Sequence, residues 1–362
     1  MTGDWPLTRL LTEVVGSGPR SADDMSYDQA REAFARILAG APEPETLGAF
    51  WLANRWKRNT PAELAGFVDA MRERSVAVAR PSADPLDCGA NYDGKTDTAL
   101  LGVAAGLVAA EAGTPVVVHS ADRVPASEGV AYRHVLDELG VETDLAPSAS
   151  AAMVDEVGFG FYAQSRANPG VDALLPARRN LGVRSFVNTV ETLANPADAN
   201  AHLASFFHLS FARKLVEALC ESDQKVGRVV AFQGLGGYDD VRPGTTRFAE
   251  WDGEFRDDER ETATLGLTAD GEALEVSDVR TDSARLTESV LAGDREGAFA
   301  DAVAVNAGVR IYARGDVDSI RDGVELARKT LADGDAAHRL DALRAFDESE
   351  HVPVDAHENA TD

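Results

Sequence analysis

The stretch that decides the fold runs from residue 60 to residue 85 and reads TPAELAGFVDAMRERSVAVARPSADP. It opens with Thr60-Pro-Ala-Glu63, a capping box with proline at the first helical position, and apolar residues then recur at helical spacing. The prolines of Arg80-Pro-Ser-Ala-Asp-Pro85 end this periodicity. Because the sequence pattern differs on the two sides of this break, we expect two domains, covering residues 1–79 and 80–346.

Helical patterns fill the N-terminal side of the break. One apolar-periodic segment starts at Pro6, Ser26 is placed to cap a second, and a third starts at about Glu45. Together with the helix that begins after Thr60, these segments predict a domain of four helices.

The C-terminal side alternates short β-rich runs with helices, which is typical of an α/β domain with a mostly parallel sheet. Helices return from about residue 285 to 346, and residues 347–362 are acidic and aperiodic, as expected of a mobile tail. The expected strands cover residues 115–119, 159–163, 185–189, 203–208 and 228–233, and the expected helices between them cover residues 97–112 and 131–139.

The charge balance is strongly acidic. The 362 residues include 35 Lys and Arg against 61 Asp and Glu, a formal net charge of -26, and only five of the basic residues are Lys. Such a composition resembles that of proteins from salt-rich cytoplasm, where the screening length falls to about 3 Å at 1 M salt, so we expect stability to rise with salt. The same charge disfavours unspecific binding to nucleic acid or to anionic membranes.

The N-terminal sequence, the length of the apolar runs and the two cysteines indicate an intracellular protein. The N-terminus has an early acid, Asp4, and lacks the basic segment and apolar core of a secretory signal. The longest uncharged apolar run, Ala99 to Ala110, is shorter than the roughly 20 residues that a membrane span needs. Two distant cysteines, Cys88 and Cys220, indicate neither a disulfide framework nor a zinc site. We expect a cytoplasmic protein without a membrane partner.

A loop that contains glycine, Gly89-Ala-Asn-Tyr-Asp-Gly-Lys-Thr-Asp-Thr98, leads into the apolar helix expected from Asp97. Backbone N–H groups, hydroxyls and a lysine at a helix N-terminus suit a phosphate, although the loop matches neither the P-loop nor the dinucleotide fingerprint. An equally good interpretation is that Asp97 caps the helix and Gly94 makes a turn. Under the phosphate interpretation, the candidate ligands are Asn91, Asp93, Gly94, Lys95, Thr96 and Thr98.

Polar residues also follow two of the expected strands. The strand at 115–119 ends in His119 and continues to Arg123 and Ser127, which could share a crevice with the loop because ligands collect beyond the carboxyl ends of strands. A packed, hydrogen-bonded side chain is the alternative for His119. After the strand at 228–233, a glycine-rich turn leads to Asp239 and Asp240, a carboxylate pair suited to Mg²⁺. Ordinary turn acids are the alternative, since this chain is rich in Asp.

An arginine-rich segment offers a different kind of contact. In Pro176-Ala-Arg178-Arg179, the guanidinium of Arg178 could grip a carboxylate, although an Arg-rich protein also carries many exposed arginines without such a role. No Ser-His-Asp or Cys-His nucleophile pattern is readable in the chain. We therefore assign no catalytic residue.

The order of segments resembles the anthranilate phosphoribosyltransferase family, also called glycosyltransferase family 3. The helical part is similar to the family in residues 28–40 and 60–73, and the C-terminal part is similar in residues 306–315 and 323–328. Between them, residues 178–196 also follow the family order. The resemblance covers almost everything from about residue 5 to residue 345.

The resemblance implies a small helical N-terminal domain packed on a larger α/β domain of the nucleoside phosphorylase/phosphoribosyltransferase type, with the active site in the cleft between them. It also implies a homodimer formed through the helical domain. The α/β domain would bind phosphoribosyl pyrophosphate and Mg²⁺, and anthranilate, an aromatic amine, would enter between the domains. The implied reaction, a step of tryptophan biosynthesis, displaces pyrophosphate from the sugar by the amine.

The phosphate-binding motifs of the family are rewritten in this chain. The family's G-T-G-G-D loop corresponds to Ala90-Asn-Tyr-Asp-Gly94, and its N-x-S-T motif to Leu100-Leu-Gly-Val103. The family's K-H-G-N-R becomes Val118-His-Ser120, and its N-x-x-G-P becomes Asn188-Thr-Val-Glu-Thr192. The family's Asp-Glu pair is Asp239-Asp240 here. Lys95 and its neighbouring threonines could replace some of the lost phosphate contacts.

An intact scaffold with a rewritten loop is similar to a second branch of the family, whose members do not make tryptophan and some of which bind nucleic acid. Four functions remain open. The chain could be a phosphoribosyltransferase, a nucleoside-phosphorylase-like enzyme, a dimeric scaffold without a ligand, or a nucleic-acid-binding paralogue whose groove starts from Arg55, Lys57 and Arg58. We favour the transferase because the retained acids and Arg178 are difficult to explain otherwise.

Overall fold

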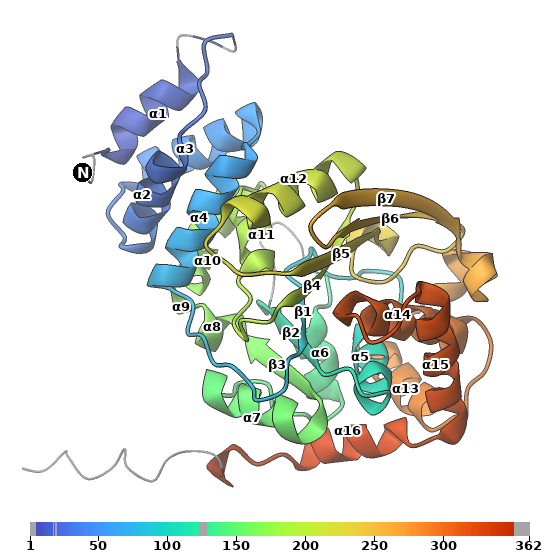
Figure 1. Ribbon diagram of the computed structural model, residues 1–362. Coiled ribbons are helices and arrows are strands. Elements are labelled where there is room, and N and C mark those ends of the chain that lie inside the picture. Colours follow the sequence, from blue (N-terminus) through green and yellow to red (C-terminus); the bar gives the residue numbers. More distant parts are fainter. Residues whose placement is uncertain (1–4, 17, 19, 123–128, 351–362) are drawn as a thin grey trace, which may run out of the picture.

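The computed structural model describes residues 5–16, 18, 20–122 and 129–350, and places a small helical domain beside a larger α/β domain (Figure 1). Both capping boxes of the helical domain form: the Ser26 and Thr60 side chains accept hydrogen bonds from the backbones of Gln29 and Glu63. The four-helix prediction is confirmed. Its helices are α1 (Leu7–Val15), α2 (Tyr27–Leu38), α3 (Pro44–Lys57) and α4 (Pro61–Arg74).

A seven-stranded sheet forms the centre of the α/β domain, in the order β3-β2-β1-β4-β5-β6-β7. The first five strands are parallel and the last two are antiparallel, so the expectation of a mostly parallel sheet is confirmed. The chain order of the strands reverses direction across the sheet between β1 and β4, which is where open α/β sheets bind ligands. The strands are β1 (Leu86–Gly89), β2 (Val116–Ser120), β3 (Phe159–Ala163), β4 (Ala201–Phe206), β5 (Arg228–Gln233), β6 (Thr245–Trp251) and β7 (Phe255–Glu261).

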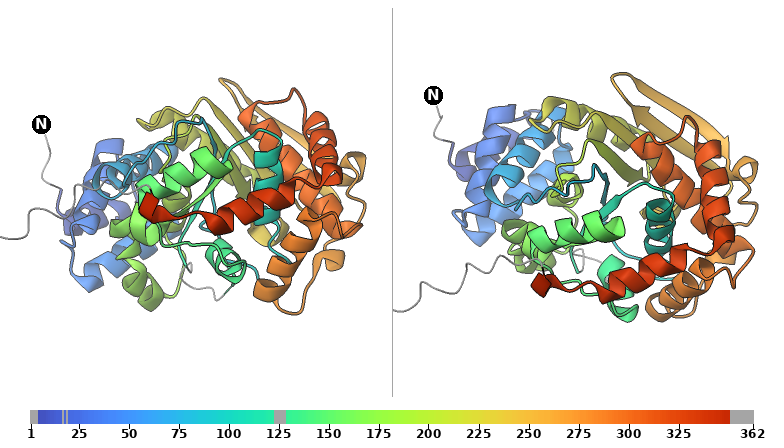
Figure 2. Two further views of the ribbon diagram at one scale, coloured as in Figure 1. Left: turned by 90° about the horizontal axis from the view of Figure 1, so that it is seen from below. Right: turned by 60° about the horizontal axis from the view of Figure 1, so that its bottom comes forward.

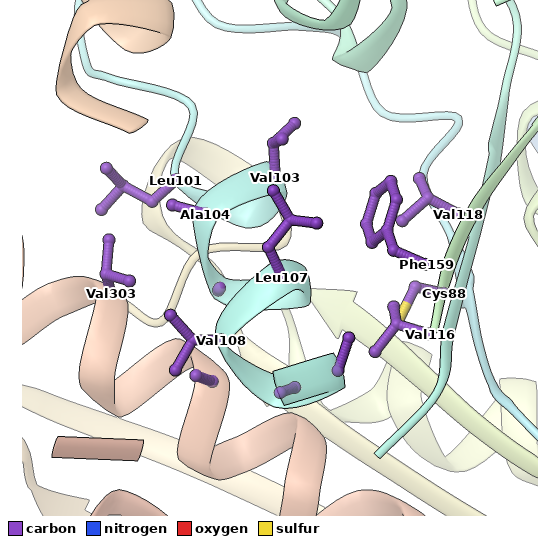
Figure 3. Packing of buried hydrophobic residues seen from close by; sticks show 14 of the residues in the cluster. Cys88, Leu101, Val103, Ala104, Leu107, Val108, Val116, Val118, Phe159 and Val303 are labelled. Atoms are coloured by element: carbon purple, nitrogen blue, oxygen red, sulfur yellow. The ribbon is translucent and has the colours of Figure 1, made fainter. Parts of the chain in front are cut away.

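One face of the sheet is covered by an apolar helix, α5 (Gly102–Glu111), and by the C-terminal helices. Figure 3 shows Leu107 between α5 and the strands that carry Val118 and Phe159, while Val108 lies toward Val303 of α14. Because α5 is buried on all sides, it needs no polar face. The helices on this side are α6 (Tyr132–Glu138), α13 (Val279–Leu291), α14 (Ala298–Arg314), α15 (Ile320–Asp333) and α16 (Ala336–Ala345). Helix α7 (Pro147–Val157) lies beside β3, where Val154 packs toward Gly160 on the opposite face of that strand.

The other face packs toward the helical domain, which lies opposite α13–α15 in both views of Figure 2. The connecting helices on this side are α8 (Gln164–Ala167), α9 (Pro169–Asp172), α10 (Leu175–Leu181), α11 (Val187–Val190) and α12 (Leu209–Glu221). Phe186, just before α11, stacks on Phe67 of α4 with ring centroids 3.9 Å apart. Residues far apart in sequence therefore share one apolar core with the helical domain.

At residues 185–189 and at the β6–β7 hairpin, the structure differs from the expected elements of this domain. Residues 185–189 form no strand: residues 187–189 belong to α11, and just before it the backbone N–H of Ser185 donates to the Asn188 side chain at 3.0 Å and closes a turn. The antiparallel β6–β7 hairpin is absent from the expected elements, because β7 reads FRDDERE and lacks an apolar alternation. Its charges suit an exposed sheet edge.

The remaining elements are short. The expected mobile tail, residues 347–362, is described only to residue 350, and there Glu348 accepts a 2.9 Å hydrogen bond from the Ala146 backbone.

In the described part of the chain, no helix is long and apolar enough to cross a membrane. The 3-10 helices are Glu191–Leu193, Leu235–Gly237, Thr262–Leu265, Glu272–Leu274 and Glu348–Glu350.

Candidate active site

A cleft of about 430 Å³ lies where the helical domain meets the carboxyl ends of β1, β4 and β5. Its position at the switch between β1 and β4 follows from the topology, because the connections on the two sides of this point leave the sheet in opposite directions. The cleft is lined by Arg55, Tyr92, Asp93, Gly94, Arg184, Ser185, Asn188, Thr189, Thr192, Ala204, Ser205, Phe206, Phe207, His208, Phe211, Leu215, Gly236, Gly237 and Tyr238.

A buried cluster of four charges lies next to this cleft. Lys95 Nζ is 2.5 Å from Asp240 Oδ2 and 3.3 Å from the Thr98 hydroxyl. Arg310 Nη2, from α14, is 3.1 Å from Asp239 Oδ2, which also accepts a hydrogen bond from the Tyr132 hydroxyl. Two cations thus compensate two carboxylates away from water, as buried charges require.

Tyr238 separates this cluster from the cleft. Its ring lines the cleft, and the Lys95 ammonium lies 5.6 Å from the ring centroid. The rings of Tyr92 and Tyr132 lie 5.4 and 6.2 Å from that of Tyr238. The charged cluster is therefore one aromatic layer away from the cleft.

Asp239 and Asp240 provide carboxylate oxygens of the kind that bind a cation. In the described part of the chain, Oδ1 of Asp239 and Oδ1 of Asp240 are buried and have no hydrogen-bond partner. Burial raises the pKa of Asp239 to about 6, although the Arg310 charge acts in the opposite direction. No group of three or more metal-binding side chains occurs among the described residues. Two carboxylates fit Mg²⁺, which commonly takes its other ligands from water and phosphate oxygens.

The predicted phosphate loop does not lie at the helix N-terminus. Helix α5 starts at Gly102 and not at Asp97, because the backbone before it bonds to other segments through isolated bridges at Lys95 and Thr98. The Lys95 backbone pairs with Val130, and Ala99 N–H donates to the Leu274 carbonyl. What does reach the start of α5 is Asp240, whose Oδ2 lies 3.5 Å from the backbone N of Leu101.

The other loop candidates are distributed around the cleft. The Asn91 side chain is buried, where it accepts from Ala121 N–H at 2.7 Å and donates to the Glu191 carbonyl at 3.2 Å. Asp93 and Gly94 line the cleft. Thr98 contacts Lys95 and Thr96 is exposed on the surface.

His119 belongs to a buried network in the sheet. Its Nε2 lies 3.3 Å from Asp87 Oδ1, and His202 Nδ1 lies 2.7 Å from Asp87 Oδ2. This arrangement matches the alternative of a hydrogen-bonded histidine in the interior. Arg123 and Ser127, the other candidates of that segment, lie outside the described residues.

Arg178 grips a carboxylate, but the carboxylate belongs to the protein. Its two terminal nitrogens lie 2.7 and 2.6 Å from the two oxygens of Glu191, and both side chains are almost fully buried. Neither residue lines the cleft. The structure thus keeps Arg178 near the predicted site without exposing its guanidinium to a ligand.

Sequence reasoning missed Arg310, one of the four charges of this cluster, and Tyr132, which donates a hydrogen bond to Asp239. Arg310 lies in the run Ala302–Ala313, which is otherwise almost entirely apolar. A charge in such a helix must find a buried partner, and this signal could have identified it. Tyr132 has no comparable signal, because its role depends on packing against Gly102, where an added Cβ would lie 1.6 Å from the Tyr132 hydroxyl.

Two family models match the chain and together account for most of it. The glycosyl transferase family, a/b domain, matches residues 92–337. The glycosyl transferase family, helical bundle domain, matches residues 13–75.

Individual relatives cover nearly the whole length. The chain is 34% identical over 328 residues to an anthranilate phosphoribosyltransferase of Natronomonas pharaonis, covering 90% of this chain and 96% of that protein. The crystal structure of anthranilate phosphoribosyltransferase from Thermus thermophilus is similar with a TM-score of 0.81 and 29% identity, covering 94% and 98% of the two chains. The structure of anthranilate phosphoribosyltransferase from Saccharomyces cerevisiae in complex with PRPP and Mg shares the fold, with a TM-score of 0.79, 17% identity and 96% and 99% coverage.

Proposed function

Because the chain belongs to the glycosyl transferase family with both its helical-bundle and its a/b domain, we propose that it is a phosphoribosyltransferase. It would transfer phosphoribose from phosphoribosyl pyrophosphate to an aromatic amine. The observation that carries this proposal is the adjacent pair Asp239 and Asp240, each with a free buried oxygen, beside Lys95 and the cleft.

The reaction exchanges one bond at C1 of the ribose. The nitrogen lone pair of the acceptor forms the new C–N bond, the C1–O bond breaks with its electron pair going to pyrophosphate, and the amine releases one proton to water. Holding the donor and the acceptor at adjacent positions would convert this into an effectively unimolecular step. Tyr92 and Tyr238 would form the wall against which the sugar and the ring are placed.

The donor pyrophosphate is expected on the Lys95 side of Tyr238. There the Lys95 ammonium can exchange its contact with Asp240 for phosphate oxygens, and the start of α5 adds backbone N–H groups. Asp239 and Asp240 would hold Mg²⁺ through their free Oδ1 atoms. When bound, Mg²⁺ would neutralise charge on the departing pyrophosphate.

Calorimetric titration with phosphoribosyl pyrophosphate in molar KCl, with and without Mg²⁺, tests this proposal. We expect micromolar binding that depends on Mg²⁺, and a loss of at least about tenfold in affinity in Asp239→Asn. Asp258→Asn, in the exposed acidic pair of β7, is the matched control and should bind like the wild type. A folded wild type that does not bind the donor would contradict the proposal, and phosphate with nucleosides and then single-stranded nucleic acid would be tested next.

The basic cluster on α3 gives little support to nucleic-acid binding. The side chain of Lys57 is only 7% exposed, and its ammonium lies 2.8 Å from Asp24 and 2.6 Å from Glu63. Its charge is therefore compensated within the protein.

We also propose that the chain forms a homodimer through the outer face of the helical domain. Trp56 is 81% exposed and Leu52 is 49% exposed, and they lie one turn apart on α3. Val15 of α1 adds a third exposed apolar side chain at 46%. Sedimentation in molar KCl should give a dimer for the wild type and a monomer for Trp56→Asp; a wild-type monomer would contradict this arrangement.

A further inference from the structure

The proposed reaction removes one proton from the acceptor amine. As the amine nitrogen forms its bond to C1 of the ribose, it becomes positively charged and must lose a proton, which finally passes to water. A side chain that lines the cleft and accepts a proton near neutral pH speeds such a step. Histidine is the residue type with this property.

In the described part of the chain, one histidine lines the cleft, and it is His208. It lies shortly after β4 and directly before α12, at a position exposed to solvent. Its ring meets that of Phe207 edge-on, with the ring centroids 4.8 Å apart. His208 is the N-cap residue of α12, but among the described residues its side chain makes no capping hydrogen bond. The imidazole is therefore accessible both from the cleft and from water.

The other titratable groups that line the described cleft are poorly suited to accept this proton. The carboxylate of Asp93 is already paired with Arg184. Burial raises the pKa of Tyr92 and of Tyr238 above the ordinary value of 10.0, so neither phenol is ionised near neutral pH. Arg55, as an arginine, stays protonated.

The other candidate bases of the α/β domain do not line the cleft. His119 and His202 both contact Asp87 in the interior of the sheet. Asp239 and Asp240 are also absent from the residues that line the described cleft.

The basic side chains that follow His208 on α12 have contacts of their own. The Arg213 guanidinium lies 4.1 Å from the ring centroid of Phe255, and Lys214 Nζ donates a hydrogen bond to the backbone carbonyl of Asn59.

We propose that His208 is the general base of the reaction. A ring nitrogen of His208 accepts one proton of the amine, and the electron pair of the broken N–H bond stays on the amine nitrogen. The lone pair of that nitrogen forms the C–N bond, and the electron pair of the C1–O bond leaves with pyrophosphate. The imidazolium then returns the proton to water, since His208 is exposed. This inference rests on the proposed function and adds a catalytic residue to it.

Turnover and binding by His208→Gln test the assignment. The probes are anthranilate and phosphoribosyl pyrophosphate with Mg²⁺, in molar KCl. Glutamine keeps a polar side chain at this position but cannot accept the proton, so kcat should fall about 100-fold. The calorimetric affinities for both probes should stay unchanged. The matched control is His338→Gln, an exposed histidine of α16 outside the cleft, which should turn over like the wild type.

The pH profile and chemical rescue provide readouts that a structural role would not change. The wild-type kcat should fall as the pH drops from about 8 to about 5, because an imidazolium cannot accept a proton, and His208→Gln should lack this dependence. Imidazole added to the solution should restore part of the kcat of His208→Ala.

A wild-type kcat and pH profile in His208→Gln would overturn the assignment. So would weaker binding of the two probes that accounts for the whole loss of rate in this variant. A wild type that neither binds the donor nor turns over would instead overturn the proposed function.

Discussion

Lys95 Nζ lies 2.5 Å from Asp240 Oδ2, and the two side chains are 2% and 1% exposed. This contact joins the glycine-containing loop after β1 to the acidic pair after β5, which lie far apart in the chain. Asp240 Oδ2 also lies 3.5 Å from the backbone N of Leu101, the residue before α5, which is a position that suits an anion. A bound donor would therefore compete with an internal carboxylate.

Replacing Lys95 should separate stability from donor binding. Lys95→Ala leaves Asp240 buried without its cation and should lower the free energy of unfolding by about 3 kcal/mol. Lys95→Ala/Asp240→Asn should recover most of this loss but none of the donor affinity. Urea denaturation and calorimetry measure the two effects. A double variant as unstable as Lys95→Ala would show that the ion pair is not the cause.

The pair of Arg178 and Glu191 should behave as a structural unit. Arg178→Met or Glu191→Met alone leaves one buried charge and should cost about 3 to 5 kcal/mol of unfolding free energy. Arg178→Met/Glu191→Met should cost much less than the sum, because no charge stays uncompensated. A double-mutant cycle in urea measures this coupling. Additive losses would contradict it.

The network around Asp87 predicts a stability that depends on pH in acid. Burial acts to raise the pKa of Asp87, but His119 and His202 more than offset it and hold the pKa below the ordinary value of 3.8. The native state therefore favours the carboxylate, so its stabilising contribution is complete above about pH 4 and is lost as the pH falls further.

Urea denaturation of the wild type and Asp87→Asn between pH 7 and pH 3 checks this prediction. The wild type should lose stability more steeply below pH 4, by at most about 1.4 kcal/mol per pH unit from this group. Asp257→Asn, on the exposed strand β7, should follow the wild type. Parallel curves for the wild type and Asp87→Asn would contradict the assignment.

The contact between Phe186 and Phe67 should be essential for joining the domains. Phe186 is 4% exposed and its ring stacks on Phe67 with an interplanar angle of 14°. Phe186→Ala should lower the free energy of unfolding by about 3 to 5 kcal/mol, because it leaves a cavity in the shared core. Val183→Ala, at a 37% exposed position nearby, is the control and should have little effect. Equal losses in both variants would argue against this role.

The acid excess predicts stabilisation by salt. With a net charge of -26, repulsion between carboxylates should be relieved as the screening length falls from about 10 Å at 0.1 M to about 3 Å at 1 M. The Tm should rise by several degrees over this range of KCl. A Tm that does not change with KCl would show that repulsion between carboxylates does not destabilise the protein.

Features that depend on neighbouring residues were predicted correctly from the sequence. Strands 159–163 and 228–233, the Ser26 cap and the Thr60 capping box form where expected, because apolar runs and caps are encoded by neighbouring residues. The strand expected at 185–189 does not form: residues 187–189 belong to α11, and Phe186 before it packs on Phe67 and not in a sheet. The helix expected from Asp97 begins only at Gly102, since backbone pairing of the intervening segment with residues 130 and 274 is not local.

The sequence by itself determined the two-domain architecture, the mostly parallel sheet and the family, since these depend on patterns that the chain carries locally and in order. It also singled out Lys95, Asp239, Asp240 and Arg178 as candidate residues for binding a ligand or a metal ion. Only the tertiary structure decided their partners: Lys95 meets Asp240, and Arg178 is withdrawn from the cleft by Glu191. The reason is electrostatic, because a buried charge must be compensated by whichever opposite charge the folded chain brings near it, and sequence distance does not specify that partner.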